Sequence, residues 1–310
     1  MCGRSALSLN KTELQGACSF KRKESNIYVK PDWLVEHNDG KDYTPSYNIA
    51  PTDVTPVLLS SSKYKNATKS DRLLKPMMWG MIPPWHKGNY KNHNLSTNNC
   101  RIENITNSKL YTPILNNGGR CVIVVEGYYE WQTTNKASKV KQPYYLYAQQ
   151  KPEVKIDEPN TWDNTYDEEN GWRGIKLLYM AGLYNIWQNE DVIIYSYSVI
   201  TMESNSSLSW LHHRVPAILD TQELMEAWLD VDNVPPNAAI SLLKPTNTLS
   251  WHRVSKLVNN SKYKASDCNK KIPEQKTNKE KQKTLTTWFT KTAKRQNENC
   301  STVPSKKNKF

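Results

Sequence analysis

The sequence has no stretch of about 18 apolar residues, which is the length that a membrane-spanning helix needs. Its first residues, MCGRSALSLN, also lack the apolar run of a signal peptide. The six cysteines lie far apart, without a CxxC pair or a Cys/His cluster at zinc-finger spacing. We therefore expect a soluble intracellular protein with reduced thiols, no metal and no other cofactor.

Acidic residues are scarce in two parts of the chain, which carries a net charge of +12. Residues 255–310 contain 15 basic and 4 acidic side chains, and residues 1–150 contain 20 and 11. Residues 151–254 have the opposite balance, with 7 basic and 15 acidic side chains. Nucleic acid is a natural partner for the basic parts, because neutralising its phosphates releases counterions. Ordinary solvated surface lysine is the alternative interpretation.

Strand-like runs are rich in Val, Ile and Tyr and are bounded by Gly, Asn, Pro or charged residues. They cover residues 121–131, 143–150, 176–187 and 191–202. Helical signals are fewer and cover residues 11–18, residues 221–230, where Thr221 can cap, and residues 237–244. These patterns predict an α+β fold with a mainly antiparallel, curved or barrel-like sheet and a few helices.

Polar segments divide the rest of the chain. Residues 60–70 and 151–170 are expected to be surface loops. From about residue 259 the chain is Lys, Asn, Thr and Ser with almost no apolar residues, a composition that cannot offset the entropy of ordering. We therefore expect a catalytic and DNA-binding domain at residues 1–258 and a disordered basic tail at residues 259–310.

Cys2 directly follows the initiator methionine. Removal of Met1 would leave a thiol and a free α-amine on adjacent carbons, with reference pKa values of roughly 8.5 and 8. An aldehyde condenses with such an amine to an imine, and the thiolate then closes a five-membered thiazolidine. A cysteine at this position is often incidental, so the other motifs decide between the two interpretations.

Those motifs are MCGR at the start, SYNIAPT (46–52), MMWGMIPPW (77–85), STNNCRIEN (96–104), EGYYEW (126–131) and LHHRVPAIL (211–219). In this order and spacing the sequence resembles the SOS response-associated peptidase family over residues 2–258. The resemblance implies that family's barrel-like fold and an enzyme that bonds covalently to abasic sites in single-stranded DNA.

The resemblance also implies roles for individual residues. Cys2 matches the nucleophile, and Glu130 matches the glutamate that manages proton transfers at the cysteine amine. His212 matches the histidine that assists opening of the abasic sugar, and Asn99 matches the asparagine that orients the nucleophile. In HHRVP, Val215 stands where the family has methionine, and we expect this change to alter packing rather than chemistry.

The chemistry agrees with these assignments. An imidazole that titrates close to neutrality can open the hemiacetal of an abasic sugar, which suits His212. A partly buried carboxylate with a raised pKa can take protons from the amine and return them to the departing hydroxyl, which suits Glu130. The alternative is structural: Glu130, His212 and His213 would then be hydrogen-bonded core groups.

Several further side chains are candidates for contact with DNA. The tryptophans of MMWGMIPPW could stack on unpaired bases, with core packing as the alternative. The arginines and lysines could bind phosphate, and the family resemblance implies this role for Arg101. Ion pairing is the alternative for Arg101 and Arg214. The candidates are Arg4, Trp79, Trp85, Lys87, Lys91, Arg101 and Arg214.

The tail contains one apolar motif, QKTLTTWF at residues 282–289, which resembles a PCNA-interacting peptide. Leu285, Trp288 and Phe289 would share one side of a helical turn and fill a pocket of the sliding clamp, while Gln282 docks separately. The surrounding lysines are compatible with nuclear import. The motif predicts a clamp partner in the nucleus, at replication forks.

The sequence thus predicts a monomeric abasic-site crosslinking enzyme that also removes its own Met1. A non-catalytic reader of modified cytosine is one rival, and it would need neither a free Cys2 amine nor Glu130. A cysteine peptidase is the other rival, and it would hydrolyse peptides without DNA.

Overall fold

A closed barrel of five strands forms the centre of the computed structural model, which describes residues 3–22, 25–34, 38–64, 70–134 and 141–273. The barrel strands are β6 (Val54–Ser60), β7 (Arg72–Trp79), β9 (Arg120–Val125), β14 (Leu178–Asn189) and β15 (Val192–Glu203). Antiparallel pairing runs from β7 through β6, β9 and β14 to β15, and a parallel pairing of β15 with β7 closes the ring.

Three short strands extend the barrel: β4 (Asp32–Trp33), β8 (Asn99–Arg101) and β16 (Arg214–Pro216). β4 pairs with β7, whereas β8 and β16 both pair with the end of β15. Thr201 of β15 lies opposite Arg101 on one side and Pro216 on the other. Two segments far apart in the sequence therefore flank the same strand end.

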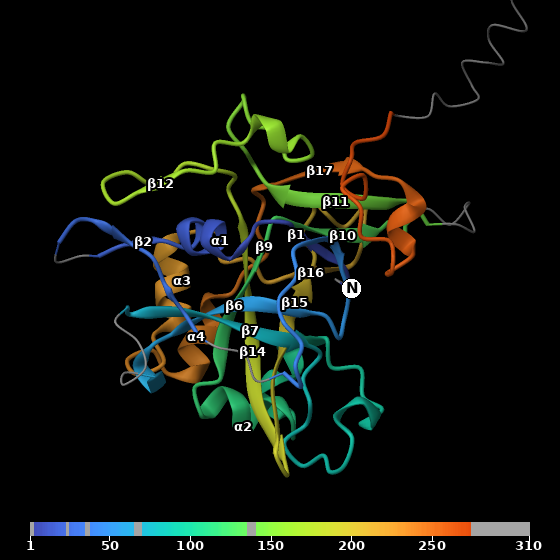
Figure 1. Ribbon diagram of the computed structural model, residues 1–310. Coiled ribbons are helices and arrows are strands. Elements are labelled where there is room, and N and C mark those ends of the chain that lie inside the picture. The colour runs from blue at the N-terminus through green and yellow to red at the C-terminus, as the bar shows by residue number, and fades with distance from the viewer. Residues whose placement is uncertain (1–2, 23–24, 35–37, 65–69, 135–140, 274–310) are drawn as a thin grey trace, which may run out of the picture. The chain divides into compact units, whose positions relative to one another are not determined.

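A second, antiparallel sheet lies beside the barrel (Figure 1). Its order is β17 (Leu249–Arg253), β11 (Pro143–Ala148), β10 (Gly127–Trp131), β1 (Ser5–Leu7) and β5 (Ser46–Ile49). The chain passes from the barrel strand β9 to β10 through a single residue, Glu126. Two small ribbons pair β2 (Phe20–Lys21) with β3 (Tyr28–Val29) and β12 (Tyr166–Asp167) with β13 (Gly171–Trp172).

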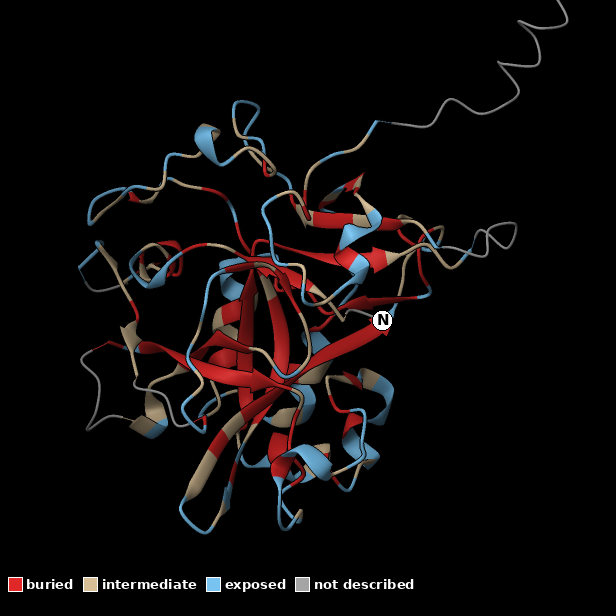
Figure 2. Ribbon diagram, turned by 45° about the vertical axis from the view of Figure 1, so that its right-hand side comes forward, coloured by how far each residue is buried: buried red, intermediate tan, exposed pale blue. Residues whose placement is uncertain are grey.

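Most barrel strands are apolar because both of their faces are largely covered. β7 and β9 are buried along their whole length, and Figure 2 shows buried strands in the barrel and in the second sheet. Long runs of Val, Ile, Leu and Met are typical of strands without a solvent face. The structure confirms the expected α+β class with a mainly antiparallel, barrel-like core.

The helices are α1 (Lys11–Ala17), α2 (Tyr111–Asn116), α3 (Gln222–Leu229) and α4 (Pro236–Leu242), so the three predicted helices are confirmed. Asn10 begins α1 with a capping box, in which its side chain accepts from the Glu13 amide and Glu13 accepts from the Asn10 amide. Short 3-10 helices are η1 (Ser62–Tyr64), η2 (Tyr90–Asn92), η3 (Ile102–Asn107), η4 (Pro159–Thr161) and η5 (Lys256–Asn259). No helix in the described ranges is long and apolar enough to cross a membrane.

Two expectations for local structure need correction. The run at residues 121–131 is two strands in two different sheets, because buried Glu126 separates β9 from β10. The loop at residues 151–170 is not purely a surface feature: Ile156 is buried in the core, and residues 166–167 form β12. A count of apolar residues misses such segments, since a single apolar side chain is enough to anchor a loop.

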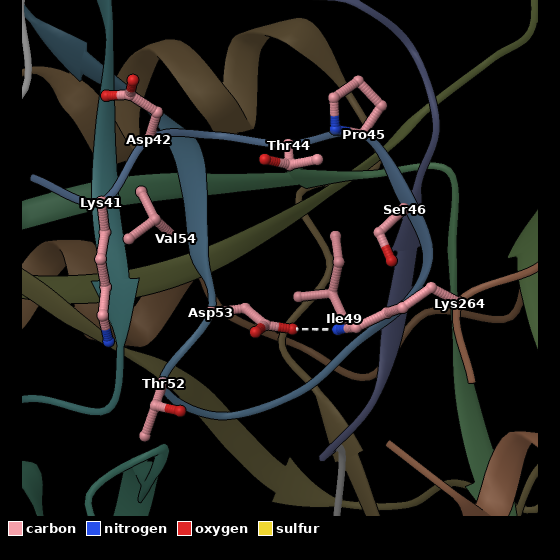
Figure 3. A pocket seen from close by; sticks show the side chains of 10 residues that line it. All are labelled: Lys41, Asp42, Thr44, Pro45, Ser46, Ile49, Thr52, Asp53, Val54 and Lys264. Carbon is pink, nitrogen blue, oxygen red and sulfur yellow. Dashed lines mark hydrogen bonds and ion pairs between the residues drawn. The ribbon is translucent and has the colours of Figure 1, made fainter. Parts of the chain in front are cut away.

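The compact unit ends at Ile272, beyond the boundary expected at residue 258. We call residues 259–272 the strap. The strap buries Cys268 and Asn269 and adds Lys264, which pairs with Asp53 at 2.5 Å (Figure 3). Composition predicted disorder here because the strap is held mainly by polar contacts to backbone rather than by apolar side chains.

Asn48 is the centre of those contacts. Its buried amide nitrogen donates to the carbonyls of Val258 at 3.2 Å, Asn260 at 3.0 Å and Tyr263 at 2.8 Å. Its amide oxygen accepts from the Arg4 guanidinium at 3.1 Å. One side chain of β5 therefore ties the strap to the beginning of the chain.

Replacing Asn48 with alanine is expected to lower the free energy of unfolding by roughly 3 kcal/mol, because three backbone carbonyls and the Arg4 guanidinium each lose a hydrogen bond. Denaturant unfolding measures this loss. Asn116→Ala, at an exposed position on α2, serves as the matched control and should change stability by less than about 0.5 kcal/mol. A similarly small loss for Asn48→Ala would contradict the proposed importance of these contacts.

Candidate functional site

Glu130 lies on β10, and its side chain is buried with 4% of its surface exposed. β10 runs antiparallel to β1, and the Tyr129 amide donates to the Arg4 carbonyl at 2.9 Å. The first described residues, Gly3 and Arg4, therefore lie beside Glu130. Burial raises the pKa of the Glu130 carboxyl, so protonated and ionised forms exchange at a higher pH than for an exposed glutamate.

His212 lies just before β16 and is also buried, with 6% of its surface exposed. Its Nδ1 is 3.0 Å from the amide nitrogen of Arg214 and 3.1 Å from the carbonyl oxygen of the same residue. The neutral ring accepts from that amide, and the protonated ring donates to that carbonyl. The same neighbour thus holds the imidazole in both protonation states.

The pKa of His212 corrects one expectation from the sequence. Burial lowers this pKa to about 4, so the imidazole is neutral at physiological pH in the free protein and does not titrate close to neutrality. With Nδ1 accepting from the Arg214 amide, the ring proton of the neutral form lies on Nε2. His212 can therefore offer an Nε2–H hydrogen-bond donor.

Backbone contacts bring Glu130 and His212 into one region. The segment that follows β10 bonds to the segment that precedes β16, since the Thr133 amide donates to the Leu211 carbonyl at 2.9 Å. Beyond the effect of burial, the positive charge of Lys141 lowers the pKa of both Glu130 and His212. A carboxylate, an imidazole and a lysine thus share one site at the end of the second sheet.

Asn99 and Arg101 lie on β8, on the opposite side of the β15 end from β16. Arg101 is exposed, and Asn99 is half-buried. Arg214 joins the two sides: its guanidinium donates to Glu103 at 2.7 and 2.9 Å and to the Thr201 carbonyl at 2.7 Å. This bidentate clamp fixes β16, and with it His212, against η3.

These contacts of Arg214 contradict the prediction that its side chain binds DNA. The Arg214 side chain is only 7% exposed, and both of its terminal nitrogens bond to Glu103 or the Thr201 carbonyl, so it is a positioning residue. Arg4 is likewise occupied, because it donates to Asn48 and to the carbonyls of Val258 and Asn259. The sequence could not separate these arginines from Arg101, since charge alone does not reveal a partner.

The two tryptophans of MMWGMIPPW differ. Trp79 is 2% exposed, its Nε1 donates to the Asn98 carbonyl at 2.9 Å, and its ring stacks on Tyr197. The expectation that Trp79 stacks on DNA is therefore wrong, because the ring belongs to the core. Trp85 is 53% exposed, and Lys87 and Lys91 are exposed in the same loop.

Two pockets adjoin each other and share Lys41 and Thr52 in their walls. The first has a volume of about 410 Å³ and contains the Lys264–Asp53 ion pair (Figure 3). The second, of about 430 Å³, extends to Lys91 and Asn98, next to Asn99. Thr52 has a φ of 79°, which is strained for a β-branched residue and indicates a backbone held in place by its surroundings.

Sequence reasoning missed two residues of this region. Glu126, in the same motif as Glu130, is fully buried and accepts from the Ser8 and Leu9 amides, and burial raises its pKa to about 7. Lys141 had no motif to indicate it. Within the described residues no cluster of His, Cys, Asp and Glu could hold a metal ion.

Other predicted residues lie outside the described ranges. They are Cys2, Gln282, Leu285, Trp288 and Phe289. Their roles therefore remain predictions.

These features define a class of protein: an α+β fold with a closed barrel and a buried carboxylate and imidazole beside the start of the chain. The chain belongs to the SOS response associated peptidase (SRAP) family, which matches residues 1–261.

Named relatives come from animals and bacteria. The abasic site processing protein HMCES of Xenopus tropicalis is 38% identical over 272 residues, which are 86% of this chain and 77% of that protein. The abasic site processing protein YoqW of Bacillus subtilis is 27% identical over 225 residues, 71% of this chain and 84% of that protein. A crystal structure of a Bacteroides thetaiotaomicron protein is similar in fold, with a TM-score of 0.62, 21% identity, and coverage of 88% of this chain and 100% of that one.

The depressed pKa of His212 predicts a loss of stability on acidification. Between pH 6.5 and about 4 the unfolded histidine binds a proton and the folded one does not, so stability falls as the pH falls through this window. We expect the wild type to lose roughly 3 kcal/mol more than His212→Gln between pH 7 and pH 4. Denaturant unfolding at both pH values measures this difference. His213→Gln, at the exposed neighbour, is the control and should behave as wild type; parallel curves for His212→Gln would contradict the prediction.

Proposed function

We propose that this protein processes abasic sites in single-stranded DNA by bonding to them covalently through Cys2. The observation that carries the proposal is Glu130, a buried carboxylate with a raised pKa beside Gly3 and Arg4. Cys2 is joined directly to Gly3, so its amine and thiol belong to this part of the chain. Relatives that bear the name abasic site processing protein support a role in the processing of abasic sites.

The reaction starts from the ring-opened aldehyde of the abasic sugar. The α-amine of Cys2 adds to the aldehyde carbon, and loss of one water gives an imine. The thiol then adds to the imine carbon, its proton goes to the nitrogen, and a thiazolidine closes. Because no imine remains, β-elimination stops, and the DNA strand stays intact while the lesion is masked.

Glu130 and His212 divide the proton transfers. Ionised Glu130 takes a proton from the Cys2 ammonium group and, once protonated, delivers it to the departing hydroxyl. Neutral His212 donates a hydrogen bond from Nε2 to the ring oxygen of the sugar and stabilises the negative charge that develops there as the ring opens. Its lowered pKa keeps the imidazole in this neutral form. Asn99 orients the nucleophile, as the family resemblance implies.

Single-stranded DNA reaches this site along a basic, partly aromatic surface. Arg101, Lys87 and Lys91 contact phosphates, and the exposed Trp85 stacks on an unpaired base. The two adjoining pockets support this path, because their shared wall includes Lys41 and the second pocket extends to Asn98. An unpaired strand exposes the lesion without the cost of unstacking a duplex.

The same groups remove Met1 before the enzyme acts. With Glu130 as base, the Cys2 thiol attacks the Met1 carbonyl carbon, so a thioester forms and the peptide C–N bond breaks to free the α-amine. Water then hydrolyses the thioester, which releases methionine and regenerates the thiol. The protein acts as a monomer in the nucleus. The motif at residues 282–289 binds the PCNA sliding clamp and brings the enzyme to replication forks.

The test is a search for an adduct that survives denaturation after the purified protein meets a single-stranded oligonucleotide with one abasic site. We expect a stable adduct with the aldehyde form and none after the aldehyde has been reduced to an alcohol. Tight binding without an adduct, by a chain with a verified Cys2 terminus, would replace this proposal with a non-covalent DNA reader. Turnover of peptides without DNA would favour a peptidase.

A further inference from the structure

Three aromatic side chains form a continuous surface next to the candidate site, which we call the aromatic ledge: Tyr144, Trp210 and Trp251. The Tyr144 and Trp210 rings meet edge to face with centroids 5.0 Å apart. The Trp210 and Trp251 rings are tilted with centroids 5.9 Å apart. Trp251 lies on the edge strand β17 and is 41% exposed.

The ledge begins at the catalytic carboxylate. Tyr144 is the cross-strand partner of Glu130 in the β10–β11 pair, so both side chains lie on the same face of the sheet. Trp210 precedes His212 by two residues, and its carbonyl accepts from the Thr134 hydroxyl. The aromatic ledge therefore starts beside Glu130 and His212 and extends away from them to Trp251.

Two positively charged side chains, Arg253 and Lys141, lie near these rings. Arg253 lies opposite Tyr144 in the β11–β17 pair, and its guanidinium donates to Gln142 at 3.1 Å. Lys141 is exposed, and its charge reaches Glu130 and His212. Exposed rings flanked by cations are the combination that binds single-stranded nucleic acid, in which bases stack and phosphates pair with positive charge.

We infer that the aromatic ledge is a nucleobase-binding subsite that stacks the base of a nucleotide next to the abasic lesion. The inference rests on the proposed function and adds a place for the intact neighbours of the damaged nucleotide. Stacking tolerates any base, because every base has a π-face. The ledge thus fixes the strand while the sugar reacts, and Trp251, as its most exposed ring, supplies the stacking face.

The test compares crosslinking of the full chain to two single-stranded oligonucleotides. Each carries one abasic site, flanked on both sides either by thymine nucleotides or by base-free tetrahydrofuran residues. We expect Trp251→Ala to slow crosslinking to the thymine-flanked strand by roughly tenfold, the effect of losing one base–aromatic stack. With base-free neighbours, Trp251→Ala and wild type should react at equal rates.

Two further variants separate stacking from a structural effect. Trp251→Phe keeps an aromatic face and should recover most of the rate. Ile186→Ala removes an apolar side chain that is 46% exposed on β14, and it should leave both rates unchanged. Thermal unfolding of each variant checks that the fold is retained.

Equal slowing of Trp251→Ala on both oligonucleotides would overturn the inference, because the ring would then act through the fold. No slowing on either would overturn it as well. If the wild type forms no adduct at all, the proposed function fails instead. In that case fluorescence anisotropy measures the affinity of wild type and Trp251→Ala for undamaged strands made of thymine or base-free nucleotides. An equal loss of affinity on both strands, or no loss on either, would refute the proposed base-stacking role of the ledge.

Discussion

Replacing Cys2 with alanine is expected to abolish the stable adduct and to turn the reaction into strand cleavage. Because the variant lacks the thiol proposed to remove Met1, it is prepared with the introduced alanine as its verified first residue. It then has a free α-amine and still forms an imine with the abasic aldehyde. Without a thiol the thiazolidine cannot close. The imine instead makes the neighbouring carbon acidic, and loss of its proton expels the 3′ phosphate by β-elimination. A denaturing gel that resolves adduct, intact strand and cleaved strand measures both effects.

Serine at position 2 keeps roughly the size of the cysteine side chain but is a poor nucleophile, because an alcohol is far less nucleophilic than a thiolate. Cys2→Ser should therefore also lose the adduct. Cys18→Ala is the matched control: the Cys18 thiol is buried, burial raises its pKa to about 12, and its removal should leave crosslinking intact. An adduct that persists in Cys2→Ala, with its terminus verified by mass spectrometry, would show that another nucleophile forms the bond.

The strands and helices could be predicted where the local sequence favours the secondary structure that forms. Runs rich in apolar and tyrosine residues became β14 and β15, and capping residues such as Thr221 began helices where expected. Closure of the barrel was not visible, because the parallel pairing of β15 with β7 joins segments far apart in the sequence. The strap was also missed, since its order depends largely on partners elsewhere in the sequence, above all Asn48 in β5.

The residues of the candidate site could also be predicted only in part. Motifs indicated Glu130 and His212, and the structure brings them into one region. Motifs could not tell a buried residue from an exposed one, so Trp79 and Arg214 were expected to contact DNA although one packs in the core and the other clamps Glu103. Burial depends on tertiary neighbours, which a motif of a few residues does not contain.

Replacing Glu130 with glutamine is expected to slow adduct formation by roughly 10²- to 10⁴-fold, which is the usual contribution of a general acid–base group. Glutamine preserves the volume of the side chain and one acceptor oxygen, but its amide replaces the second oxygen with an NH2 donor and cannot take a proton. DNA affinity should be unchanged, and binding to a strand with a tetrahydrofuran abasic analogue, which lacks the aldehyde, measures it separately. With unchanged DNA affinity, the loss of rate is assigned to the chemical step.

The pH dependence identifies the group that has been removed. Burial raises the Glu130 pKa, so in the wild type the rate should fall on acidification at a pH above the ordinary glutamate range, as the carboxylate takes up its proton. Glu130→Gln should lose this acidic limb and keep the limb near pH 8 that reflects the α-amine, about 8 being its reference value. Glu153→Gln, at an exposed position, should retain both limbs. If Glu130→Gln keeps the acidic limb at full rate, the proton transfers belong to another group, and the buried carboxylate is a structural element of β10.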